Sequence, residues 1–134
     1  MRAFIDAPLL IYLNTMSDPR ARMSYEDFYI RTLTDYKLYT DVFVLDEVTY
    51  ISKRKYGIPY YVSSRFIESI ILPYISIINL GEDEYKLAAR ILVEYNLKPS
   101  DSLHLGAMLS NGINLIISED REFDRIKEVK RLWI

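Results

Sequence analysis

The chain has 134 residues, half of them hydrophobic and 27% charged, which suits a single globular domain with one apolar core. It has no cysteine, which excludes disulfides, thiolate zinc sites and cysteine nucleophiles and fits an intracellular protein. The formal net charge of −2 gives no strong overall attraction to nucleic acid, so a nucleic-acid partner requires a local basic patch.

The first half of the chain predicts strands alternating with helices. A short apolar run opens the chain, and the helix after it has Pro8 in its first turn, where the missing N–H does no harm. Ser17-Asp18-Pro19 is a break, and Ser24 is a plausible N-cap for an aromatic helical stripe. In chain order we expect a strand at 2–5, a helix at 8–16, a helix from Ser24 to Tyr36, a strand at 42–45 and a helix from Asp46 to Gly57.

The second half continues the alternation. Acidic residues 82–84 suit the N-terminus of a helix dipole, and Pro99 suits the first turn of the next helix. The expected elements are a helix at 60–72, a strand at 74–80, helices at 82–95 and 99–111, a strand at 114–118, a helical turn at 122–126 and a strand at 130–133. The strands are continuous apolar runs, which indicates a mostly parallel sheet of about five strands between two helical layers. The fold class is therefore α/β, with three α/β/α layers in one domain over residues 1–134.

The sequence predicts no membrane segment. Asp6 interrupts the apolar start, so no signal peptide is expected there. The most apolar stretch, residues 66–80, contains Glu68 and Pro73 and is too polar to cross a bilayer. We therefore expect a cytoplasmic protein.

Four acids follow predicted strands or open predicted helices: Asp6, Glu47, Asp101 and Asp120. The carboxyl ends of parallel strands meet at one rim of a sheet, where α/β proteins place ligands. Carboxylates gathered there repel one another unless a divalent cation neutralises them. The pattern thus predicts a site for Mg²⁺ or Mn²⁺, with chemistry on phosphodiesters as the expected reaction.

Each of these acids also has an ordinary structural explanation. An aspartate after a strand is most often a helix N-cap, and an acid in the first turn of a helix suits the dipole. Asp46 competes with Glu47 for any metal role, and three neighbours compete with Asp120: Glu119, Glu122 and Asp124. Only the joint placement of the four supports a site.

Other residue types leave alternatives open. His104, the only histidine, is either satisfied by a buried neighbour or helps a catalytic carboxylate. The basic clusters at 53–55 and 121–131 are either solvated helix ends or phosphate contacts. The aromatic residues spaced from Tyr25 to Tyr39 fit core packing first, and a partner groove or RNA stacking second. Four glycines at 57, 81, 106 and 112 allow no phosphate-binding glycine loop.

The sequence resembles the PIN domain family, and most closely the VapC type of toxin ribonuclease. The resemblance covers nearly the whole chain and rests on four short motifs in the family's order: Phe4-Ile5-Asp6-Ala7 with Leu9-Leu10-Ile11-Tyr12, Leu45-Asp46-Glu47-Val48, Asp101-Ser102-Leu103-His104-Leu105-Gly106-Ala107, and Ile117-Ser118-Glu119-Asp120-Arg121-Glu122-Phe123-Asp124.

That resemblance implies a function and a site. It makes Asp6, Glu47, Asp101 and Asp120 the metal-binding and catalytic acids, with Asp124 as a fifth metal ligand. The implied activity is endonucleolytic cleavage of RNA by an activated water with Mg²⁺ or Mn²⁺. The implied partners are an antitoxin protein, whose C-terminal segment fills the groove, and a second copy of the chain in a homodimer.

One position departs from the family pattern. The family often has Asn or Ser two residues after the first Asp, and here that residue is Pro8. Pro8 has no side-chain donor, which keeps open the alternative of a PIN-like module that binds RNA or protein without cleaving it. The resemblance also leaves a second alternative, a PIN nuclease that processes RNA without an antitoxin.

Overall fold

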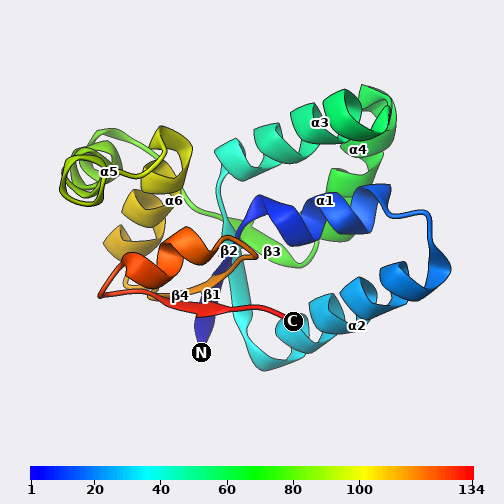
Figure 1. The fold of residues 1–134 in the computed structure, drawn as a ribbon, viewed down its shortest axis with the longest axis horizontal. Coiled ribbons are helices and arrows are strands. Elements are labelled where there is room, and N and C mark those ends of the chain that lie inside the picture. Colours follow the sequence, from blue (N-terminus) through cyan, green and yellow to red (C-terminus); the bar gives the residue numbers. More distant parts are fainter.

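A five-stranded parallel sheet forms the centre of the molecule (Figure 1). The computed structural model describes all residues, 1–134. The strands are β1 (Arg2–Ile5), β2 (Lys37–Thr40), β3 (Ile75–Ile77), β4 (Leu115–Ile117) and β5 (Lys130–Leu132). They lie in the order β3-β2-β1-β4-β5, and every pair is parallel. The predicted α/β class and strand number are confirmed.

Six α-helices cover the two faces of the sheet (Figure 1). They are α1 (Ala7–Thr15), α2 (Pro19–Asp35), α3 (Val42–Tyr56), α4 (Tyr60–Phe66), α5 (Glu82–Tyr95) and α6 (Pro99–Ser110). The strand order reverses direction at β1, and crossovers between parallel strands are right-handed, so α1–α4 cover one face and α5–α6 the other. The largest side chains with almost no exposure include Phe4, Leu9, Leu105, Met108 and Ile116, from both layers and the sheet.

The predicted strand at 42–45 is wrong, because those residues open α3. The strand lies just before them, at Lys37–Thr40, and Asp41 caps the helix by accepting a hydrogen bond from Val44 N–H at 2.9 Å. Val44 and Val48 are buried and one helical turn apart, whereas Val42 and Phe43 are exposed. The apolar run therefore divides between two sides of a helix. Glu47 consequently lies in the second turn of α3, and not in the first as predicted.

The predicted start of the second helix at Ser24 is also wrong. Helix α2 begins five residues earlier, at Pro19, with the Asp18 carboxylate accepting a hydrogen bond from Ala21 N–H. Proline at the first helical position has a suitable φ and no N–H to satisfy, so the Asp18-Pro19 pair starts a helix where a break was expected. The aromatic stripe on α2 serves the core, since Phe28 and Tyr29 are buried and Tyr25 packs against the buried cluster.

The remaining elements match their predictions in type. The strand at 2–5 and the helix at 82–95 also match at both ends, and the others differ at one or both ends. The helix predicted over 60–72 is α4 followed by a π-helical segment, Ile67–Ile71. The turn after β4 is a 3₁₀-helix, Arg121–Arg125. None of the helices is both long enough and apolar enough to cross a bilayer.

Candidate active site

Three neighbouring strands end beside one another at the carboxyl rim of the sheet. Asp6 follows β1, Asp41 follows β2 one residue after Thr40, and Ser118 follows β4. Strand β1 lies between the other two, so these polar residues are brought together. Asp6 and Asp41 each cap the helix that follows, α1 and α3, with a side-chain oxygen. The residues that directly follow the strands therefore place two buried carboxylates at the rim.

A cavity of about 510 Å³ opens at this rim, and all four principal predicted acids line it. Asp6 comes from the end of β1, Glu47 from α3, Asp101 from the first turn of α6, and Asp120 from the loop after β4. Two lysines also line it, Lys55 from α3 and Lys98 from the residue before α6. The sequence positions lie up to 114 residues apart, and the parallel topology makes them neighbours.

Hydrogen bonds hold Asp6 and Asp120 in place. Ala7 N–H donates to one oxygen of Asp6 at 2.8 Å, and Ser118 Oγ–H donates to the other at 2.7 Å. The same Ser118 oxygen accepts a bond from Asp120 N–H at 3.1 Å. Ser118 thus connects the first acid to the loop that carries the fourth.

The acids shift one another's protonation. Burial raises the pKa of Asp6, and the charge of Asp120 adds to the increase, while His104 and Ser118 oppose it. Burial together with the charges of Asp6 and Asp120 raises the pKa of Asp101 to about 6. The pKa of Glu47 is raised by burial and by Asp6 and Asp101. These shifts indicate a concentration of negative charge that a bound cation would relieve.

His104 and Asp41 form a buried pair directly behind the cavity. His104 Nδ1 lies 2.7 Å from an Asp41 oxygen, and neither side chain is exposed. The other ring nitrogen, Nε2, lies 3.9 Å from Asp6 Oδ1 and has no hydrogen-bond partner. Burial alone would lower the pKa of His104, but the hydrogen bond and charge of Asp41, with Asp6 and Glu47, raise it overall. Asp41 was not predicted as a site residue. The second strand was predicted at 42–45, after Asp41, and not before it at Lys37–Thr40.

The competing acids lie elsewhere. Asp46 and Asp124 are exposed and do not line the cavity. The Asp124 carboxylate accepts two hydrogen bonds from Arg131, at 2.9 and 3.1 Å, and this arginine lowers its pKa. Glu119 lines the cavity and accepts a hydrogen bond from Tyr12 Oη. Asn14 on α1 donates hydrogen bonds to Ser52 and Ser63.

The carboxylates around the cavity are the type of ligand that a hard divalent cation prefers, but the distances between them fit such a cation only in part. The acids offer oxygen ligands, which Mg²⁺ and Mn²⁺ prefer. As the side chains lie, no three acids or histidines stand close enough to hold one metal ion together. Mg²⁺ is commonly bound by one or two carboxylates and several waters, so this spacing suits ligation that is partly through water.

Solved structures share this fold at low sequence identity. VapBC2 from Rickettsia felis, bound to a DNA fragment from its promoter, matches with a TM-score of 0.76 and 15% identity over 99% of this chain and 98% of that one. VapC20 from Mycobacterium tuberculosis, a sarcin-ricin loop cleaving toxin, matches at 0.75 and 16% over 93% and 95%. A toxin–antitoxin complex from Klebsiella pneumoniae matches at 0.67 and 22% over 96% and 95%.

No curated protein matches the chain in sequence. The model of the PIN domain family matches residues 3–129, from the first strand to the residue before β5. That match spans the cavity and all four acids around it. The chain therefore belongs to the PIN domain family.

Proposed function

We propose that this chain is a metal-dependent endoribonuclease that cleaves RNA phosphodiester bonds with an activated water. The observation that carries the proposal is the gathering of Asp6, Glu47, Asp101 and Asp120 around one cavity, three of them with raised pKa values. Structural stability alone does not explain this arrangement, because mutual repulsion of buried carboxylates destabilises the fold. Membership of the PIN family supports the same reading.

Asp6, Asp101 and Asp120 would hold the cation, Mg²⁺ or Mn²⁺, directly or through water, and Glu47 would reach it or its water from α3. A divalent cation bound there would lower the pKa of a bound water and neutralise charge on the phosphate. We do not include Asp124 in this set, because its carboxylate is already bound to Arg131 outside the cavity.

The side chains themselves suggest a division of tasks. Glu47 has a raised pKa, which makes its carboxylate a better proton acceptor for an attacking water than an ordinary glutamate. Lys55 and Lys98 line the same cavity and would attract the phosphates on either side of the cleaved bond. Ser118 orients Asp6 by donating to the oxygen that Ala7 leaves free.

We further propose that the chain is the toxin of a toxin–antitoxin pair, a homodimer inhibited by a cognate antitoxin. The support is the fold shared with the VapBC proteins of Rickettsia felis and with VapC20. Expression in a bacterial host tests this part. Growth arrest that is relieved by Asp101→Asn favours a toxin, whereas normal growth with an active nuclease favours RNA processing without an antitoxin.

Cleavage of a mixed RNA pool tests the nuclease. Wild type, Asp6→Asn, Asp101→Asn and Asp46→Asn are purified in parallel and assayed with Mn²⁺, with Mg²⁺ and with EDTA. We expect metal-dependent cleavage by wild type and by Asp46→Asn, whose acid is exposed and outside the cavity. Cleavage by Asp6→Asn or Asp101→Asn at the wild-type rate would defeat the assignment.

Two observations favour a second candidate function, a PIN-like module that binds without cleaving. No three acids or histidines stand close enough to coordinate one ion directly, and Pro8, which lines the cavity, has no side-chain donor. Calorimetric titration with Mn²⁺ separates the two. Absence of metal binding, together with absence of cleavage, would favour the binding module.

A further inference from the structure

The last turns of α3 and the start of α4 carry positive charge with no acid among them. Residues 48–67 contain four of the 17 lysines and arginines of the chain and none of its 19 acids. Lysines at a helix C-terminus suit the dipole, but this segment also lies in a chain of net charge −2. It is therefore a local basic surface on an otherwise acidic protein.

The cations of this segment are free of carboxylate partners. No ion pair involves Lys53, Arg54 or Lys55. The second basic cluster of the chain differs, because its Arg125 and Arg131 are bound to Glu122 and Asp124. Of the two clusters that the sequence offered as phosphate contacts, the one on α3 has no cation in an ion pair, whereas the C-terminal one has two of its arginines paired.

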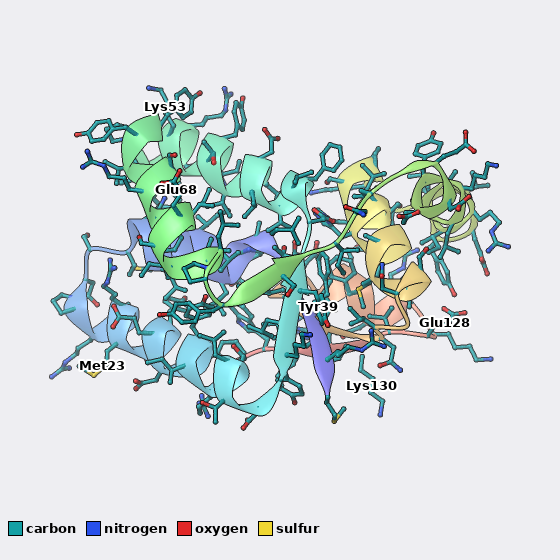
Figure 2. All side chains as sticks on the ribbon, turned by 180° about the vertical axis from the view of Figure 1, so that it is seen from behind. Met23, Tyr39, Lys53, Glu68, Glu128 and Lys130 are labelled. Atoms are coloured by element: carbon teal, nitrogen blue, oxygen red, sulfur yellow. The ribbon has the colours of Figure 1, made fainter.

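Exposed tyrosines stand among these cations. Tyr50, Tyr56 and Tyr60 each expose about half of their surface, at 50%, 48% and 52%. Lys53 Nζ lies 4.6 Å from the centre of the Tyr60 ring, and Arg54 Cζ lies 6.0 Å from that of Tyr50. Figure 2 shows Lys53 pointing outward from the end of α3. We call the set of six the Tyr–Lys surface: Tyr50, Lys53, Arg54, Lys55, Tyr56 and Tyr60.

The Tyr–Lys surface is continuous with the acidic cavity. Tyr50, Lys55 and Tyr56 line that cavity together with the acids. From there the surface continues around the exposed side of α3 to Lys53 and Tyr60. A strand crossing it would lead directly to the proposed reaction centre.

We propose that the Tyr–Lys surface binds an unpaired RNA strand, with bases stacked on its tyrosines and phosphates held by its lysines and Arg54. Surfaces that combine aromatic rings with a basic track bind single strands, because every base has a face for stacking and the backbone supplies the charge. A duplex keeps its bases stacked on each other, so it offers phosphates and 2′-hydroxyls but no free base faces. This inference rests on the proposed nuclease and assigns the residues that would hold its RNA beside the reaction centre.

Binding measured apart from cleavage tests the surface. In an Asp101→Asn background, which is expected to prevent cleavage, fluorescence anisotropy is recorded for an unstructured RNA 12-mer and for a 12-base-pair RNA duplex. Removing one stacking ring is expected to weaken 12-mer binding roughly tenfold for Tyr50→Ala or Tyr56→Ala. The conservative Tyr50→Phe and Tyr56→Phe keep the ring and should bind as the parent does.

Charge is tested by salt dependence. The double variant Lys53→Ser/Lys55→Ser should lower the slope of log affinity against log salt by roughly 1.4, the value for two single-strand phosphate contacts. Matched controls lie away from the cavity: Tyr85→Ala on α5, and Lys37→Ser/Lys86→Ser on β2 and α5, none of them lining it. These controls should leave both affinity and slope unchanged.

The outcomes separate this inference from the nuclease proposal. If the tyrosine variants bind the 12-mer as the parent does, the inference fails, and a protein partner becomes the remaining occupant of the surface. If duplex and 12-mer lose affinity equally in those variants, stacking of unpaired bases is excluded. If the tyrosine and lysine variants weaken binding but the wild-type chain cleaves no RNA, the surface stands and the nuclease fails.

Discussion

At the scale of single residues, the folded structure disfavours the ionised form of the Asp101 carboxyl group. Its pKa is raised from 3.8 to about 6 by burial and by the charges of Asp6 and Asp120. A raised carboxyl pKa means that the folded state holds this proton more tightly than the unfolded state. Stability therefore falls as pH rises from about 4 to about 6, and the loss is complete above pH 6.

Asp101→Asn should accordingly stabilise the fold while it abolishes the proposed cleavage. At 1.36 kcal/mol per pKa unit, discounted for the partial exposure of Asp101, the expected gain is about 1–2 kcal/mol at pH 7.5. The gain should disappear near pH 3, below the ordinary pKa of 3.8, where Asp101 is protonated in both states. Urea unfolding at the two pH values measures it, with exposed Asp27→Asn on α2 as control. A destabilised Asp101→Asn at pH 7.5 would contradict the electrostatic account.

Asp41 is expected to contribute strongly to stability. Asp41→Ala removes the cap of α3 and leaves His104 Nδ1 buried without its partner. The lost cap and the orphaned donor together predict a loss of about 2–4 kcal/mol in the free energy of unfolding. Asp41→Asn keeps an oxygen for the cap, and its amide can pair with the other tautomer of His104, so its loss should be smaller. Equal losses in both variants, measured by urea unfolding, would argue against the buried pair.

Most acids of the cavity could be predicted from the sequence. The buried pair of Asp41 and His104 could not, because no sequence pattern indicates it. Asp6 and Asp120 follow strands, and Asp101 opens a helix, so the topology alone brings them to one rim. The pairing of Asp41 with His104 joins residues 63 apart, and no local spacing relates them. Asp124 was predicted as a metal ligand from its position near Asp120. Nothing in the sequence indicates that Arg131 binds its carboxylate.

At the scale of elements, the contact between α5 and α6 sets the position of Asp101 and His104. Gly106 faces α5 so closely that a Cβ there would lie 2.5 Å from Glu84 O and 2.8 Å from Ala88 Cβ. Backbone atoms of α5 cannot yield as a flexible side chain does. The absence of a side chain at Gly106 therefore lets α6, which carries both site residues, pack directly against α5.

Gly106→Ala should destabilise the protein even though alanine is the better helix former. Alanine would gain about 1 kcal/mol in helix propensity, but overpacking of this contact is expected to outweigh it, for a net loss of about 1–2 kcal/mol. Thermal unfolding measures the loss. Gly81→Ser is the matched control, because its Cβ would meet nothing within 4 Å and serine is a good N-cap for α5. Stabilisation by Gly106→Ala would mean that the helices move apart freely.

The element boundaries that sequence analysis misplaced have a common cause. Residues 42–45 are apolar enough for a strand, yet Asp41 before them is an N-cap, and only Val44 among the first three residues of α3 is buried. A run of four apolar residues does not distinguish a buried strand from the start of a helix. At Pro19 the same holds, because a proline after an aspartate starts a helix as readily as it ends one.

At the scale of the whole molecule, the parallel sheet gathers acids that the chain keeps far apart. In the order β3-β2-β1-β4-β5, the strand that carries Asp6 is central, with the loop of Asp120 on one side and α3 on the other. The two helical layers then close over this rim from opposite faces and bring in Glu47 and Asp101. Without a cation the carboxylates at this rim repel one another, and a bound cation would remove that repulsion.

Divalent metal should therefore stabilise the whole domain. A cation that binds only the folded state adds about 2.7 kcal/mol at a concentration of 100 times its Kd, which for a domain of this size raises Tm by roughly 10 °C. Thermal unfolding of wild type in Mn²⁺ or Mg²⁺, compared with EDTA at matched ionic strength, measures the rise. Asp46→Asn should show the full rise and Asp101→Asn much less of it, because Asp101 lines the cavity and Asp46 does not. The same Tm for wild type in metal and in EDTA would place the four acids outside any metal site, whatever RNA the chain cleaves.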